Sequence, residues 1–278
     1  MREHSRVPHW LRHGGIVFGG GIVVIVISAA LFAPLLAPYD VEARDIRNRF
    51  QPPSSTHLLG TDNFGRDTLS RVLFGARISL QVALLAVGMA ALIGVTLGAL
   101  AGYFGGMLDA IIMRTVDVFL AFPAILLALT LVAAFGPSTV SVTVALGLVY
   151  WTSYARVVKS SILAWKNEDF VEANRALGAA WPRTLFLHVL PNAFGPIVVV
   201  ASVGIGSAVT AEAALSFLGL GVPPPAPSWG SLLNTGLQYL RQAPYLSTFS
   251  GAAIMVTVLG FNLLGDGLRD ILDPRKTS

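Results

Sequence analysis

Six long apolar runs constrain the fold of this chain more than any other feature of its sequence. They are Gly15–Ala37, Ile78–Gly102, Thr115–Ala134, Val140–Val158, Ala193–Phe217 and Phe249–Leu268. A helix that crosses a bilayer needs about 20 predominantly apolar residues, and each run is close to or above that length. The sequence therefore predicts an all-α, polytopic membrane protein with about six transmembrane helices.

The composition agrees with lipid as the solvent for much of the chain. Hydrophobic residues make up 54% of the sequence and charged residues only 12%, whereas soluble domains carry about 25% charged residues. The net charge of +4 does not indicate nucleic acid as a partner, because Lys and Arg also gather at the cytoplasmic ends of membrane helices. The absence of cysteine excludes disulfides, thiolate metal ligands and a cysteine nucleophile.

The first apolar run follows Arg2, Arg6 and Arg12, which raises the question of a signal peptide. The apolar core of a signal peptide has about 7–15 residues and is followed by a small-x-small cleavage site. This run is longer and ends in Pro34 and Pro38, so we expect an uncleaved first span. Alternating the six spans puts twelve Lys and Arg residues on the side of the N-terminus and seven on the other. The bias predicts that both termini are cytoplasmic.

Two loops are predicted on the outer side. Residues 39–77 carry charges of both signs, and the spacing of Asp62, Arg66 and Asp67 favours local salt bridges in a loop folded over the membrane face. Residues 219–248 contain the run Pro223–Pro225, which cannot continue a helix. This second loop is either a cap over the outer mouth or a plain connector.

A polar segment at 165–191 interrupts the apolar pattern on the cytoplasmic side. It carries six charged residues between Lys166 and Arg183. At roughly 3 kcal/mol for each charge at a helix centre, burying the segment in hydrocarbon would cost on the order of 18 kcal/mol. The segment must therefore lie outside the bilayer core.

The local pattern of this segment predicts a helix, a bend and a second helix. Asn167 is a plausible N-cap, and Gly178 suits the left-handed position that follows a helix end. Pro182 suits the first turn of a second helix at Arg183–Leu190, and Pro191 leads into the fifth span.

The two faces of the first helix differ in character. Phe170, Ala173 and Leu177 recur at helical spacing on one face, while Glu172 and Arg175 are i, i+3 neighbours on another. From the residues alone, two interpretations remain open. One is an interfacial amphipathic loop, and the other is a lever that docks against a partner protein.

The remaining polar residues give no catalytic or metal-binding pattern. No Gly-x-x-x-x-Gly-Lys-Ser/Thr loop is present, so another chain must bind ATP if ATP drives the protein. The five histidines fall in predicted loops or termini without metal-ligand spacing. Glu212, near the outer end of the fifth span, is expected to pair with Arg241 or to cap the helix end rather than to relay protons.

One motif in the polar segment resembles a known family. Glu172-Ala173-Asn174-(x)3-Gly178-(x)11-Leu190-Pro191 is similar to the EAA loop of ABC importer membrane subunits, with Asn174 where the family usually has alanine. In that family the loop forms a coupling helix that docks in a groove of a cytoplasmic ATPase. The resemblance implies an ATPase-coupling role for nine residues: Phe170, Glu172, Ala173, Asn174, Arg175, Leu177, Gly178, Leu190 and Pro191.

Further motifs narrow the resemblance to the C-type permease subunit of dipeptide, oligopeptide and nickel ABC importers. They lie at 57–67 (HLLGTDNFGRD), 102–106 (GYFGG), 114–123 (RTVDVFLAFP), 212–221 (EAALSFLGLG) and 262–266 (NLLGD). The family implies the type I ABC importer permease fold, with a first unit at 1–75, a core at 76–268 and a tail at 269–278. It also implies a multi-pass protein of a prokaryotic cytoplasmic membrane.

The same resemblance implies the partners. They are a homologous B-type permease, two cytoplasmic ATPases that hold ATP and Mg, and an extracytoplasmic substrate-binding protein, while this chain binds no cofactor and is not an enzyme. The competing class is a stand-alone secondary transporter or channel, which would need central ionisable residues or broken helices. The cargo, whether dipeptide, oligopeptide or nickel complex, stays open, as do the residues that line the pathway.

Overall fold

A computed structural model describes residues 14–272 of the chain, and within this range the protein is helical except for loops and one isolated bridge between Thr61 and Asp67. The predicted contributions of Arg2, Arg6, Arg12, Arg275 and Lys276 to membrane orientation lie outside the described residues. The α-helices are α1 Gly14–Leu31, α2 Ala33–Leu36, α3 Thr68–Phe104, α4 Gly106–Leu120, α5 Ala124–Phe135, α6 Thr139–Trp165, α7 Asp169–Ala176, α8 Trp181–Arg183, α9 Phe194–Phe217, α10 Trp229–Gln238 and α11 Pro244–Leu272.

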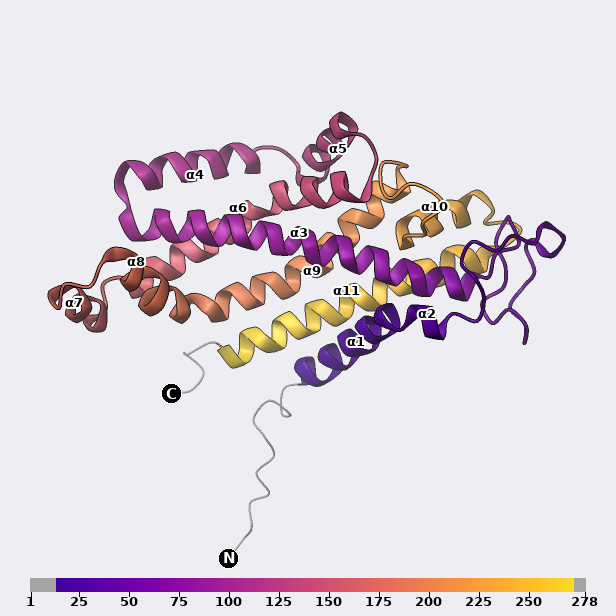
Figure 1. The fold of residues 1–278 in the computed structure, drawn as a ribbon, viewed down its shortest axis with the longest axis horizontal. Coiled ribbons are helices and arrows are strands. Elements are labelled where there is room, and N and C mark those ends of the chain that lie inside the picture. Colours follow the sequence, from indigo (N-terminus) through magenta and orange to yellow (C-terminus); the bar gives the residue numbers. More distant parts are fainter. Residues whose placement is uncertain (1–13, 273–278) are drawn as a thin grey trace, which may run out of the picture.

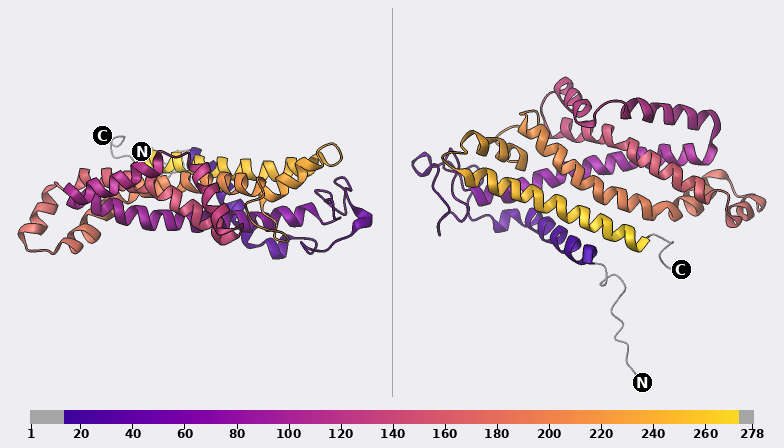
Figure 2. Two further views of the ribbon diagram at one scale, coloured as in Figure 1. Left: turned by 90° about the horizontal axis from the view of Figure 1, so that it is seen from above. Right: turned by 180° about the vertical axis from the view of Figure 1, so that it is seen from behind.

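The long helices lie side by side in one elongated bundle (Figure 1). α1 and α4 form opposite edges, and α11, α9, α3 and α6 lie between them. α3 packs along α6, α9 packs on α11, and α11 packs on α1. α7 and α8 project from one end of the bundle, whereas α10 and the loop before α3 lie at the other end, as the reverse view in Figure 2 also shows.

Among the described residues, four helical stretches are long and apolar enough to cross a membrane: α1, α3, Trp181–Phe217 and α11. They correspond to the predicted first, second, fifth and sixth spans. α6, the predicted fourth span, is 27 residues long but less apolar, because polar side chains such as Ser153 and Arg156 lie on it. The structure therefore contains four or five such spans, one or two fewer than the six predicted.

The predicted third span, Thr115–Ala134, is not a straight helix. α4 and α5 meet at an angle of 88°, and together they make a broken span or a re-entrant element. The break falls at Pro123, which has no amide hydrogen to donate and disfavours helical geometry at the residue before it. The apolar content of this run was visible in the sequence, but the proline decided its shape.

Glycines allow α3 and α6 to pack with their backbones in contact. A Cβ atom added to Gly94 would collide with the carbonyl oxygen of Trp151, and one added to Gly98 would collide with that of Ala155. Gly102 faces Ile162 in the same way. The small glycine side of α3 therefore packs directly on a helix of the same chain.

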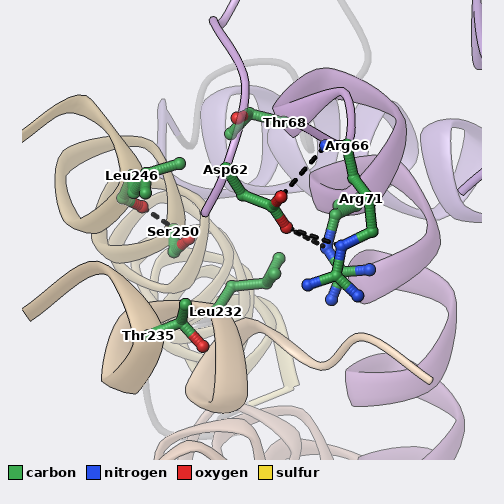
Figure 3. A pocket seen from close by; sticks show the side chains of 8 residues that line it. All are labelled: Asp62, Arg66, Thr68, Arg71, Leu232, Thr235, Leu246 and Ser250. Carbon is green, nitrogen blue, oxygen red and sulfur yellow. Dashed lines mark hydrogen bonds and ion pairs between the residues drawn. The ribbon is translucent and has the colours of Figure 1, made fainter. Parts of the chain in front are cut away.

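The loop before α3 folds into a compact cap at the end of the bundle opposite α7. The Asp62 carboxylate lies 2.7 Å from Nε of Arg66 and 3.5 Å from Nε of Arg71, and Figure 3 shows the three side chains converging beside α10 and α11. Asp67 caps α3 by accepting a hydrogen bond of 2.8 Å from the Ser70 amide. Its other oxygen lies 3.0 Å from Nδ1 of His57. The predicted local salt bridges are confirmed.

Glu212 has a different role from the one predicted, because it does not reach Arg241. Its carboxylate is fully buried and accepts hydrogen bonds from the hydroxyls of Ser79 at 2.8 Å and Ser216 at 2.6 Å. The Ser79 hydroxyl in turn accepts from the backbone amide of Trp229 at 3.2 Å. The proline-rich segment returns α10 to the bundle and covers this carboxylate, which thus joins α3, α9 and α10.

Gly98→Ala is expected to destabilise the folded chain by about 1–3 kcal/mol, because the added methyl group forces α3 away from α6. Gly88→Ala on the same helix is the matched control, since a Cβ there meets nothing within 4 Å. Thermal unfolding in detergent measures both variants. Equal stability of the two would show that the α3–α6 contact does not require glycine.

Glu212→Ala is expected to lower the thermal stability of the purified protein, because it leaves two buried hydroxyls without their acceptor, at roughly 1–3 kcal/mol each. Glu212→Gln keeps one acceptor oxygen in place and should lose less. A scan of unfolding temperature compares the two variants, and an Ala variant as stable as the Gln variant would contradict the assigned role.

Candidate functional site

The predicted polar segment forms a short helix at the free end of the bundle. α7 covers Asp169–Ala176 and carries Asp169 and Glu172 in its first turn, where acidic groups interact favourably with the helix dipole. The N-cap is Glu168, which has extended backbone angles and makes no side-chain capping bond. The prediction of Asn167 as the N-cap is wrong by one residue, because the backbone turns into the helix only after Glu168.

Gly178 ends the helix as predicted. Its φ is +78°, a left-handed value that residues with a Cβ adopt only with strain. The Gly178 amide donates to the carbonyl of Arg175 at 2.9 Å, and the Ala179 amide donates to that of Asn174 at 3.1 Å. These bonds satisfy carbonyls at the helix end. A Cβ at Gly178 would meet nothing within 4 Å, so only the backbone angle requires glycine.

Val171 anchors α7 to the bundle, and the sequence prediction did not identify it. Its side chain is fully buried in a cluster with residues of α3, α6 and the segment that leads into α9: Ala99, Val158, Ile162, Leu185, Val189 and Ala193. The signal in the sequence was a β-branched apolar residue on the face of the helix opposite Phe170, Ala173 and Leu177. Val171 thus packs against two long helices and the segment that leads into a third.

The face formed by Phe170, Ala173 and Leu177 points away from the bundle. Leu177 is 87% exposed and Phe170 is 37% exposed, and Ala173 is exposed as well. Asn174 turns its amide back on the helix and donates to the Phe170 carbonyl at 2.8 Å. The helix thus presents an apolar surface, unoccupied by its own chain, that small residues leave open to close approach.

The predicted neighbours Glu172 and Arg175 do not form an ion pair in the described part of the chain. The guanidinium of Arg175 lies instead over the ring of Tyr103 on α3, 5.2 Å from its centroid, a cation–π contact. Glu172 is exposed on the surface. Arg175 contacts the Tyr103 ring because α7 lies against the end of α3. Residue spacing along α7 cannot reveal a neighbour on another helix.

The chain after the bend runs into α9 without a break. Pro182 lies in the first turn of α8, as predicted. A π-helical turn at Thr184–Val189 and a 3-10 turn at Leu190–Ala193 then lead into α9. The predicted second helix at Arg183–Leu190 is thus present as successive helical turns of different type, and Pro191 interrupts only the regularity of a helical stretch that extends over Trp181–Phe217. A proline without an amide hydrogen fits where the turn type changes.

Two further contacts fix the loop on its other side. The Lys166 ammonium donates to the carbonyl of Gly102 at 3.0 Å. The rings of Phe104 and Trp181 meet edge to face with centroids 5.0 Å apart. Of the nine predicted coupling residues, the seven at 170–178 lie together on or beside α7. Leu190 and Pro191 lie in the turn before α9, where Leu190 packs against the cluster that holds Val171.

The sequence and the fold were compared with known proteins. Residues 94–278 match the family model described as "Binding-protein-dependent transport system inner membrane component", and residues 9–53 match the "N-terminal TM domain of oligopeptide transport permease C". The dipeptide transport system permease protein DppC of Alkalihalophilus pseudofirmus is 45% identical over 93% of this chain and 86% of the relative. DppC of Escherichia coli K12 is 47% identical over 96% and 91%.

A further relative and a solved structure are also similar to this chain. The glutathione transport system permease protein GsiD of Pectobacterium atrosepticum is 44% identical over 97% of this chain and 90% of the relative. A chain of the MetNI methionine ABC transporter in an inward-facing form superimposes with a TM-score of 0.57, covering 75% of this chain and 96% of that one at 20% identity. The second likeness supports the fold alone.

Family matches over both parts of the chain and identities of 44–47% over nearly its whole length agree with the helical architecture. The chain belongs to the family of inner-membrane components of binding-protein-dependent transport systems, the multi-pass permease subunits of ABC importers.

Proposed function

We propose that this chain is the permease subunit of an ATP-driven importer that carries dipeptides or short oligopeptides across the cytoplasmic membrane by alternating access. The observation that carries the proposal is α7, a helix with an outward apolar face that is anchored by one buried valine to the ends of the spans. The names of the relatives DppC and GsiD, which refer to dipeptide and glutathione transport, support a peptide as cargo.

The proposed partners follow from the parts that this chain lacks. Two cytoplasmic ATPases supply ATP and Mg chemistry, since the sequence contains no phosphate-binding loop. A homologous B-type permease completes the pathway, and a substrate-binding protein delivers the cargo at the end of the bundle opposite α7. In this assembly both termini and α7 are cytoplasmic, in accord with the excess of Lys and Arg on that side.

Docking at α7 follows from its exposed surface. Phe170 and Leu177 would each bury apolar area against an ATPase groove, and full burial of such a side chain is worth roughly 1.5–3 kcal/mol. Ala173 and Ala176 have small side chains, which let the groove approach the helix backbone. An isolated helix of eight residues is too short to be stable, so the Val171 anchor and the Gly178 bend hold it in shape for docking.

Coupling requires that α7 and the spans move as one body. The buried cluster around Val171 includes residues of α3 and α6, and Lys166 bonds the end of α3 directly. Cores of this density transmit displacement rather than absorbing it. ATP-driven closure of the ATPases would therefore tilt the spans. ATP binding on the ATPases and access to the solute pathway would then be linked by a coupling free energy.

Leu177→Ser is expected to weaken retention of the ATPases on the permease by about tenfold or more, because it removes an apolar side chain from the docking face. The variant loses little contact within its own chain, since Leu177 is 87% exposed. Leu58→Ser, at the opposite end of the bundle and 60% exposed, is the matched control. For both variants we measure the amount of ATPase that co-purifies with the permease and the rate of ATP-dependent uptake of Ala-Ala.

Gly178→Pro is expected to separate ATP hydrolysis from uptake while the protein still inserts in the membrane. Proline fixes φ near −65° and cannot adopt the value of +78° that ends α7. Gly178→Asn is the control, because asparagine tolerates left-handed angles better than other residues. Normal uptake by the proline variant in reconstituted vesicles, or uptake by the chain without ATPases, would overturn the coupling assignment.

A further inference from the structure

An exposed ion pair lies on the helical bundle, far from α7 and from the cap. One guanidinium nitrogen of Arg156 on α6 donates to a carboxylate oxygen of Asp117 on α4 at 2.6 Å. The two side chains are 54% and 57% exposed. By contrast, the salt bridges of the cap around Asp62 are almost fully buried. The pair therefore faces something other than the rest of its own chain.

The pair lies near the middle of α6, the predicted fourth span, which packs along the apolar helix α3. α6 has 27 residues, which correspond to about 40 Å at 1.5 Å per residue. Arg156 precedes the end of α6 at Trp165 by nine residues, or about 14 Å. A hydrocarbon core about 30 Å thick, centred on the helix, includes this position. Two exposed charged groups thus lie at a depth where apolar side chains are the rule.

Lipid is an unfavourable neighbour for this pair. Each charged side chain at the centre of a membrane helix costs roughly 2.5–3.5 kcal/mol or more when it faces hydrocarbon, and such residues almost always face a bundle interior or a water-filled cavity. By contrast, the exposed side chains of α1 are apolar, with Val24 and Ile25 exposed by 63% and 69%.

Further polar side chains share the open face with the ion pair. Ser153 and Ser160 are exposed on α6, one turn on either side of Arg156, and Ser207 and Thr210 are exposed on α9. The hydroxyl of Tyr150 on α6 lies 3.5 Å from the carbonyl oxygen of Ser207, which brings these parts of α6 and α9 together. The opposite face of α6 packs on α3, through residues such as Ala155. Between residues 141 and 160 of α6, the exposed residues Ser153, Arg156 and Ser160 are all polar.

We propose that the face formed by Asp117, Ser153, Arg156 and Ser207 lines the water-filled solute pathway, and that the ion pair is a binding station for the charged ends of a peptide. This inference rests on the proposed function. The guanidinium has further N–H donors, which suit the planar α-carboxylate of a peptide. The second oxygen of Asp117 suits its α-ammonium group. A zwitterionic peptide is complementary to both members of the pair at once.

Site-specific thiol labelling tests the pathway, because the chain contains no cysteine of its own. Ser153→Cys and Ser207→Cys are introduced separately into the transporter with all its partner subunits, reconstituted in vesicles. A charged, membrane-impermeant thiol reagent is applied, and labelling is measured on this chain. Val24→Cys on α1 is the control. We expect the two serine positions to react about tenfold faster or more than position 24, since the reagent needs water to reach a thiol.

The peptide station is tested by protection. During ATP-driven turnover, Ala-Ala supplied with the binding protein is expected to slow labelling of Ser153→Cys severalfold. Protection should be lost when Arg156→Gln is added and kept when Arg156→Lys is added, because lysine retains the positive charge. Labelling of Ser153→Cys without peptide should be equal in the Gln and Lys variants, whereas a merely structural ion pair would change this labelling when the charge is lost.

Each outcome decides one part of the inference. Labelling at positions 153 and 207 that is as slow as at position 24 overturns the pathway assignment. Import of Ala-Ala without protection, or protection that survives Arg156→Gln, overturns the station. If the native transporter does not import Ala-Ala, the peptide cargo of the proposed function fails together with the station. The difference in labelling rate between positions 153 and 207 and position 24 still decides whether the face is exposed to water.

Discussion

The close contact between α3 and α6 is the constraint on which the rest of the bundle depends. Glycines at 94, 98 and 102 let the two helices touch along their backbones, and apolar side chains alone supply no driving force for helix association within lipid. With α3 and α6 fixed in this way, the Lys159–Asp109 ion pair holds α4 against one side of α6, while α9 packs beside α3.

The contact between α3 and α6 also determines where α7 lies. The ends of α3 and α6 form the floor on which Val171 packs, and the chain after Gly178 runs directly into α9. The carboxylate of Glu212 ties α9 to α3 and to the start of α10 near the opposite end. The bundle is therefore linked near both of its ends, as the proposed coupling requires.

Two kinds of charged group stand out in the described part of the chain, those that are buried with their partners and those that are paired but exposed. Glu212 is enclosed by serine hydroxyls and Asp62 by two arginines, so each has its partners inside the fold. Asp117 and Arg156 are paired but open. Since a bilayer penalises exposed charge, the contrast separates groups that hold the structure together from groups that face water or a partner.

The sequence by itself determined the class of protein and the ends of its polar segment. Apolar run length identifies most spans, the charge count excludes 165–191 from the hydrocarbon, and Gly178 and Pro182 mark the bend, because these effects depend only on neighbours along the chain. The tertiary structure decided the rest. The burial of Glu212, the partner of Arg175 and the anchor at Val171 all depend on which helices meet. Contacts between residues distant in sequence leave no periodic signal.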